Sequence, residues 1–151
     1  MTTSFALALH TTTTKLEITI AEIYQNSDRN SASYIIHKQQ SWELGRELSV
    51  SFHDCLSLFM DDIAWTDLAF LAIATGIGSF TGTRIGVVAA RTIAEQLNIP
   101  LYGISCDPIT ANAEQLNLSL GESLLAIAYE QWQNQIYPNW QDVLPIYEQL
   151  S

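Results

Sequence analysis

The sequence is short of basic residues. Lys and Arg together number 6 against 16 Asp and Glu, which gives a formal net charge of −10. Nucleic-acid phosphates and anionic membrane surfaces attract Lys and Arg, so this balance argues against unaided binding to either. A partner with a basic face would suit this charge better.

Cysteine and long apolar runs are also scarce. Cys55 and Cys106 are the two cysteines, too few for a disulfide framework, and they favour a reduced, cytoplasmic compartment. No apolar run approaches the roughly 20 residues that span a membrane. The N-terminus lacks the basic and apolar regions of a signal peptide. We therefore expect a cytoplasmic protein without a membrane segment.

Clustered catalytic or metal-binding residues are missing as well. His10, His37 and His53 are isolated, and no His-x-x-x-His pair occurs. Ser79 stands in a Gly-Ser-Phe-Thr-Gly context, which differs from the Gly-x-Ser-x-Gly context of hydrolase nucleophiles. We expect no catalytic residue, no metal and no cofactor.

What the chain does contain is a substantial apolar fraction, 48% of 151 residues, enough for the core of one domain. Helical spacing of apolar residues begins near Trp42, while earlier segments alternate with a period of two. Hairpin strands followed by a βαβ unit predict an α/β fold with a mixed sheet and helices on both faces. Strands are expected at 5–9, 16–24, 33–37, 68–74, 101–105 and 124–128, and helices at about 44–59, 82–97 and 107–116. The third of these helices is expected to have Asp107 as its N-cap and Pro108 at its first position.

Four of the seven glycines lie between Gly76 and Gly86, in a predicted turn from strand to helix. A Walker A phosphate loop is excluded, because Thr83 and Arg84 follow Gly82 where that loop needs Lys and Ser or Thr. A dinucleotide fingerprint fits loosely, with one residue too many between the glycines. A tight turn for close packing, with Ser79 or Thr81 capping the helix, is the better interpretation of the isolated pattern.

The same stretch, Gly76-Ile-Gly-Ser-Phe-Thr-Gly-Thr-Arg-Ile-Gly86, resembles the Gly-x-Gly-Pro-Gly-Ser-Phe-Thr-Gly-x-Arg-Ile-Gly signature of the TsaB (YeaZ) family. These are bacterial proteins of tRNA threonylcarbamoyladenosine biosynthesis, often described as glycoprotease-like. The strand and Thr-rich turn near the N-terminus and the segment Ile99–Ser105 support the resemblance, which covers residues 5–110.

The resemblance implies an actin/hexokinase-like (RNase H-like) fold and a non-catalytic partner of TsaD, with TsaE in a larger complex. In the family the first two helices form the interface with TsaD, and a homodimer uses the same surface. Carried over, the implied interface comprises Leu44, Leu48, Phe52, Cys55, Leu56, Arg84, Ile85, Val88 and Ala89. The implied signature loop comprises Gly76, Gly78, Ser79, Phe80, Thr81 and Gly82.

The chain also departs from the family pattern. His10 stands where the family has Asp, Ile77 replaces Pro, and the chain is shorter than typical members. We expect an RNase H-like lobe at 1–110 and, at 111–151, a shortened remnant of the second lobe or a C-terminal extension. A small nucleotide-binding enzyme that uses the glycine loop, or a self-associating remnant that no longer binds TsaD, are the alternatives.

Arg84 has two interpretations. It lies near the N-terminus of the second predicted helix, where the helix dipole disfavours a cation. It is either an exposed side chain or part of a structural or interfacial ion pair, with Asp54 or Glu47 as the candidate partners on the neighbouring helix.

Overall fold

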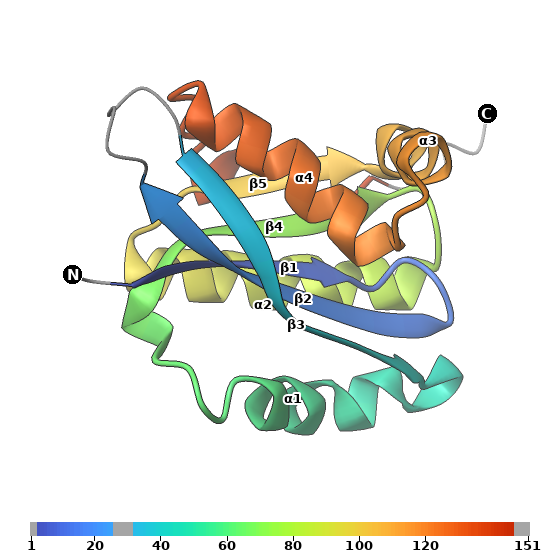
Figure 1. The fold of residues 1–151 in the computed structure, drawn as a ribbon. Coiled ribbons are helices and arrows are strands. Elements are labelled where there is room, and N and C mark those ends of the chain that lie inside the picture. The colour runs from blue at the N-terminus through green and yellow to red at the C-terminus, as the bar shows by residue number, and fades with distance from the viewer. Residues whose placement is uncertain (1–2, 26–31, 147–151) are drawn as a thin grey trace.

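The computed structural model describes residues 3–25 and 32–146 of the chain. Five strands form one mixed sheet in the order β3-β2-β1-β4-β5, and helices cover both of its faces (Figure 1). The strands are β1 (Ser4–His10), β2 (Lys15–Gln25), β3 (Ala32–Glu43), β4 (Leu68–Gly76) and β5 (Leu101–Ser105). The helices are α1 (Leu48–Phe59), α2 (Phe80–Leu97), α3 (Cys106–Leu116) and α4 (Leu120–Gln133), with short 3₁₀ turns at Gly45–Glu47, Trp65–Asp67 and Trp140–Asp142.

Strand pairing is antiparallel in one half of the sheet and parallel in the other. β1, β2 and β3 pair antiparallel as a meander, whereas β4 pairs parallel to β1, and β5 pairs parallel to β4. α2 connects β4 to β5 as the predicted βαβ unit. The predicted fold class, a mixed sheet with a hairpin before a βαβ unit and helices on both faces, is confirmed.

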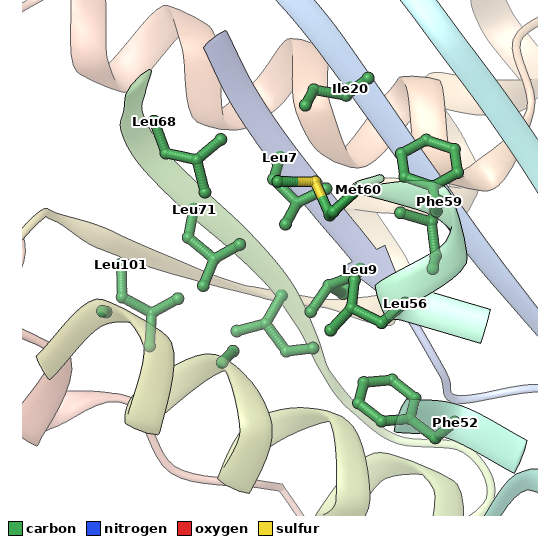
Figure 2. Packing of buried hydrophobic residues seen from close by; sticks show 14 of the residues in the cluster. Leu7, Leu9, Ile20, Phe52, Leu56, Phe59, Met60, Leu68, Leu71 and Leu101 are labelled. Carbon is green, nitrogen blue, oxygen red and sulfur yellow. The ribbon is translucent and has the colours of Figure 1, made fainter. Parts of the chain in front are cut away.

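The two faces of the sheet differ in side-chain size because strand residues alternate between them. In β1, Leu7 and Leu9 point toward α1 and α2, whereas Ala6 and Ala8 point toward α3 and α4. Figure 2 shows Leu7 and Leu9 packed with Phe52 and Leu56 of α1. Each face therefore has its own hydrophobic core. Leucine and isoleucine dominate the strand residues of the first, whereas the second combines five strand alanines with the larger Ile23, Phe70, Tyr102 and Ile104.

The predicted strand at 124–128 is wrong, because these residues lie inside α4. A short apolar run has no period of its own and fits a buried helix as well as a strand. The residues just before this run start a helix. Ser119 is the N-cap of α4, and its Oγ accepts a hydrogen bond from the Glu122 N–H at 3.1 Å. Leu124 and Leu125 then pack on the Ala-rich face of the sheet.

Two predicted helix starts are also corrected. Trp42 belongs to β3, which stays paired with β2 as far as Glu43, so helical structure begins only at Gly45. α3 begins at Cys106 with Ser105 as its N-cap, so Asp107 is not the cap and Pro108 is the third helical residue. β3 runs further than the predicted strand at 33–37, because hydrogen bonding to β2 continues to Glu43, whereas β5 ends at Ser105 as predicted and α3 follows it directly.

The chain after α4 runs back over the edge of the sheet as a segment that we call the C-terminal strap (residues 134–146). The Tyr102 hydroxyl donates to the Ile136 carbonyl at 2.6 Å, and the Ile146 N–H donates to the Thr75 carbonyl at 2.6 Å. Between these points Val143 enters the core beneath α2. The strap thus links the two faces across β5.

The predicted domain boundary at residue 110 falls inside α3. α3, α4 and the strap all pack against the same sheet as the preceding elements. What the stretch 111–146 represents stays a prediction, and residues 147–151 lie outside the described part of the chain. Within the described residues, no helix combines the length and apolar character needed to span a bilayer.

Candidate functional site

The signature loop begins where β4 ends. Gly76 has a φ of +117°, a backbone conformation that favours glycine, and the chain then turns into α2. Ser79 is the N-cap of α2, and its Oγ accepts a hydrogen bond from the Gly82 N–H at 3.3 Å. Of the two predicted caps, Ser79 is therefore confirmed, while Thr81 is already helical. Phe80 begins the helix, and its side chain is outside the described part.

The glycines of this loop lie against the threonine turn that follows β1. The Ser79 N–H donates to the Thr12 carbonyl at 2.7 Å, and the Thr11 hydroxyl donates to the Gly82 carbonyl at 2.7 Å. A Cβ at Gly78 would overlap the Thr12 carbonyl oxygen, and one at Gly82 would overlap that of Thr11. The glycines thus allow two backbones to touch, which is the packing role that the isolated pattern predicts.

His10, at the family's Asp position, closes β1 just before this turn. It is 2% exposed, and burial lowers its pKa to about 4. Its Nδ1 has no hydrogen-bond partner among the described residues. A buried neutral imidazole cannot supply the negative charge with which a carboxylate holds a metal. No group of three or more His, Cys, Asp or Glu within the described ranges is arranged to hold a metal ion.

A groove of about 660 Å³ lies between α1 and α2 on the outer side of the molecule. Both helices belong to the face with the large strand residues, so their inner sides meet over a filled core (Figure 2). Apolar, hydroxyl and aromatic side chains line the groove. They are Ser49, His53, Leu56, Ser57, Trp65, Arg84, Ile85, Val88, Ala89, Thr92 and Ile93.

The nine predicted interface residues divide into three groups. Leu56, Arg84, Ile85, Val88 and Ala89 line the groove. Leu48 and Phe52 belong instead to the core under it, at 6% and 0% exposure. Leu44 and Cys55 are half-buried against that core.

Val88 is the most accessible large apolar residue of this groove, at 57% exposure. His53, Trp65 and Ile93 also line the groove but are absent from the predicted interface. The spacing of Ser49, His53 and Ser57 beside the apolar stripe of α1 was the available signal for this wall of the groove.

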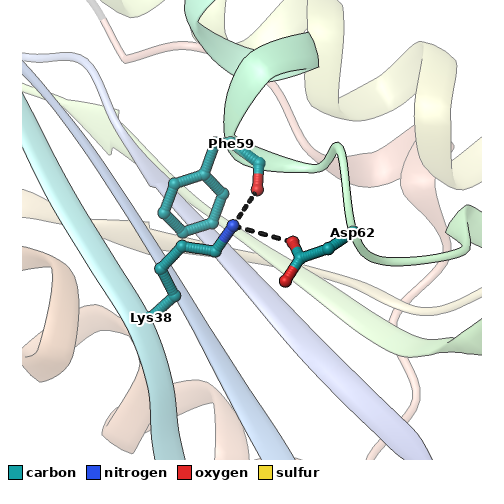
Figure 3. A network of polar contacts seen from close by, with 3 residues as sticks. All are labelled: Lys38, Phe59 and Asp62. Atoms are coloured by element: carbon teal, nitrogen blue, oxygen red, sulfur yellow. Dashed lines mark hydrogen bonds and ion pairs between the residues drawn. The ribbon is translucent and has the colours of Figure 1, made fainter.

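The end of α1 is anchored to the sheet through Lys38 of β3. Its Nζ donates to the Phe59 carbonyl at 2.5 Å and pairs with the Asp62 carboxylate at 2.8 Å (Figure 3). The ammonium also lies 4.8 Å from the centre of the Phe59 ring. A cation is favourable at the negative C-terminal end of a helix. This contact therefore fixes the wall of the groove that α1 forms.

Arg84 makes no ion pair within the described part of the chain, where Lys38–Asp62 is the single one. The predicted pairing of Arg84 with Asp54 or Glu47 is therefore not formed, and Arg84 is exposed at the groove. All three side chains are exposed, and holding long side chains in one geometry offsets most of the Coulomb gain at a surface. The guanidinium stays available to a group outside the chain.

Comparisons with known proteins identify relatives of this chain in sequence and in fold. A profile of the family described as "TsaD: tRNA N6-adenosine threonylcarbamoyltransferase" matches residues 45–127, which include α1, α2 and the signature loop. The "tRNA threonylcarbamoyladenosine biosynthesis protein TsaB" of Bacillus subtilis (strain 168) is 34% identical over 77 residues, 50% of this chain. The protein of the same name from Buchnera aphidicola subsp. Schizaphis graminum is 34% identical over 65 residues, 43% of this chain.

Both alignments cover only part of the TsaB proteins. The aligned part is 31% of each of the two TsaB proteins, so the chain spans about a third of their length. The solved structure "YeaZ from Pseudomonas aeruginosa" superposes with a TM-score of 0.75 at 15% identity, covering 96% of this chain and 100% of that one. At this identity the superposition shows a shared fold, and it confirms the expected actin/hexokinase-like architecture.

Proposed function

We propose a function on one premise: this chain belongs to the TsaD family of tRNA N6-adenosine threonylcarbamoyltransferases, in which its relatives are TsaB (YeaZ) proteins. From that premise, the chain takes part in tRNA threonylcarbamoyladenosine biosynthesis as a docking protein. It binds a TsaD-like protein through the α1/α2 groove, with TsaE in a larger complex, and it works in the cytoplasm.

The observation that carries this proposal is the open apolar groove. Ile85, Val88 and Ala89 of α2 offer apolar surface in the groove, on which a partner helix can pack. Leu56 of α1 also lines the groove but is only 5% exposed. A partner helix would bury Val88, which is the largest gain of apolar burial available in this groove.

A role without chemistry of its own is supported by the signature loop. Gly78 packs against Thr12 and Gly82 against Thr11, so a phosphate does not fit between these two backbones, although Gly82 also lines an adjacent cavity of about 390 Å³. His10 replaces the acid of the family pattern and is buried as a neutral group. The alternative, a nucleotide-dependent enzyme, requires saturable binding of ATP or NAD, and we expect a calorimetric titration with either to be flat.

The test is a calorimetric titration of the purified chain with the TsaD-like protein of the same organism. Val88→Asp is expected to weaken the complex by at least about tenfold, because it places a carboxylate in an apolar contact. Val50→Asp is the matched control: Val50 is 73% exposed on α1 but does not line the groove. Leu48→Asp is unsuitable, because Leu48 is buried in the core.

Two results would overturn the proposal. One is a wild-type chain that fails to bind the TsaD-like protein, which would favour the self-associating remnant. The other is a Val88→Asp variant that binds as well as Val50→Asp. Sedimentation of the chain alone tests whether the same surface forms a homodimer, since Val88→Asp should then shift the dimer to monomer and Val50→Asp should not.

A further inference from the structure

The α1/α2 groove has an unusual charge for this chain. Among the described residues no Asp or Glu lines it, whereas Arg84 does, in a chain with 16 acidic and 6 basic residues. His53 is the other ionisable residue of the lining. An acidic protein thus presents a groove without carboxylates and with a guanidinium that no described residue pairs.

The position of Arg84 on α2 adds to the positive charge of the groove. It is the fifth residue of the helix, close to the N-terminal end where backbone N–H groups leave a partial positive charge. A carboxylate brought to this point from outside would interact favourably with both the guanidinium and the helix dipole. Val88 lies one turn further along the same side of α2, so charge and apolar surface are adjacent.

We propose that the groove binds an amphipathic helix of the partner that carries an Asp or Glu beside its apolar stripe, and that Arg84 selects this carboxylate. The inference rests on the proposed docking site and adds the chemistry of its occupant. The apolar stripe covers Ile85, Val88 and Ala89, while the carboxylate takes the fork of Arg84 in a geometry that Lys would not reproduce.

A second copy of the chain suits the groove less well. In a two-fold dimer each copy presents the same patch, so the groove of one copy would meet another groove without carboxylates and another Arg84. Like charges placed together across an interface discriminate against a partner. The charge of the groove therefore favours a helix from a different protein.

The test titrates the full chain with two synthetic helical peptides that share one apolar stripe and differ in a single residue beside it, Glu or Lys. We expect the Glu peptide to bind roughly tenfold more tightly at low salt, and the difference to shrink as salt screens the charges. Arg84→Glu should reverse the preference. Arg46→Glu is the matched control, because Arg46 is exposed outside the groove and its replacement changes the net charge equally.

Equal binding of the two peptides, binding of neither, or an unchanged preference in Arg84→Glu would overturn the inference. The outcomes are distinct from those of the docking proposal. A chain that prefers the Glu peptide but does not bind the TsaD-like protein refutes the proposed function alone. A TsaD-like protein that binds through Val88 and binds Arg84→Glu as well as wild type refutes the selectivity of Arg84 alone.

Discussion

The two faces of the sheet are covered in opposite ways. On one face, large strand residues such as Leu9 and Leu71 meet α1 and α2, and an open groove remains outside between the two helices. On the other face, Ala6 and Ala8 let α4 lie close to the strands, and Gly121 packs against Thr19 with no room for a Cβ. Large residues fill a core under separated helices, whereas small residues bring a helix down onto the sheet.

Polarity differs between the faces as well. His10 and Thr19 are buried on the α4 side, and each has a polar atom without a partner among the described residues. The α1/α2 side buries the hydroxyl residues Thr11 and Thr83, but no charged or imidazole side chain among the described residues. The comparison teaches that the groove side combines a core without buried ionisable carboxyl or imidazole groups with an accessible exterior, which suits a docking surface. The α4 side is closed and structural.

The largest expected effect is a loss of stability when a core residue beneath the groove is truncated. It tests how tightly that core is packed. Phe52→Ala should lower the free energy of unfolding by about 3–5 kcal/mol, because a fully buried ring leaves a cavity. Urea denaturation followed by circular dichroism measures it. Leu58→Ala on the same helix, at 67% exposure, should change the value by less than about 0.5 kcal/mol. Similar losses in both variants would mean that the core under the groove is loose.

The next effect concerns the buried histidine of the α4 side. Burial lowers the pKa of His10 from 6.5 to about 4, so between these values the unfolded chain binds a proton that the folded chain does not. The free energy of unfolding should therefore fall as pH falls, by about 2 kcal/mol between pH 7 and pH 5.

His10→Gln isolates this contribution, because it removes the titration of His10 and leaves that of Glu17, which faces His10 across the β1–β2 pair. Burial raises the pKa of Glu17, an effect of opposite sign that is the same in both proteins. Urea denaturation at the two pH values gives the comparison. Equal pH dependence in wild type and His10→Gln would show that His10 is not kept neutral.

A smaller effect probes the close approach of α4. Gly121→Ala improves helix propensity by roughly 1 kcal/mol. It should nevertheless destabilise the protein by about 1–2 kcal/mol, because the new Cβ overlaps the Thr19 hydroxyl. Thermal unfolding measures the change. The double variant Thr19→Ala with Gly121→Ala should recover most of it, and a stabilised Gly121→Ala would show that α4 lies further from the sheet.

The smallest effect tests the link between the two faces. Tyr102→Phe removes the hydroxyl that donates to Ile136 in the C-terminal strap and should lower the free energy of unfolding by about 1 kcal/mol. Tyr137→Phe, at an exposed position in the strap, serves as the control. Hydrogen exchange should show a loss of protection at the Ile146 amide, which donates to the Thr75 carbonyl. An effect no larger than that of Tyr137→Phe would mean that the strap is held elsewhere.

Much of the fold was predictable from local patterns. The predicted strand at 101–105 matches β5, and the predicted second helix and α2 both end at Leu97, three residues before Pro100, which cannot continue a helix. The glycine-rich turn and its Ser79 cap also follow from local rules. These features depend on which backbone conformations one or a few residues can adopt, and residue type alone sets those conformations.

The candidate site was predictable in part. The signature and the apolar spacing identify α1 and α2 as the helices of interest, and five of the nine predicted interface residues line the groove. Phe52 and Leu48 share the apolar stripe of α1, yet they are buried in the core. Spacing shows which residues lie on one side of a helix, but it does not show which edge of that side the sheet covers.

The sequence alone determined the mixed sheet, the βαβ unit and the family signature, because alternation, glycine and proline act through the local backbone. Tertiary structure decided three other features. The helix α4, which contains Leu124–Ala128, lies close to the sheet because small strand residues leave space for it. The threonine turn, far away in sequence, occupies the glycine loop. Arg84 lacks a partner in the described chain because the acids of α1 do not line the groove. Each of these depends on contacts between distant segments, which no local pattern encodes.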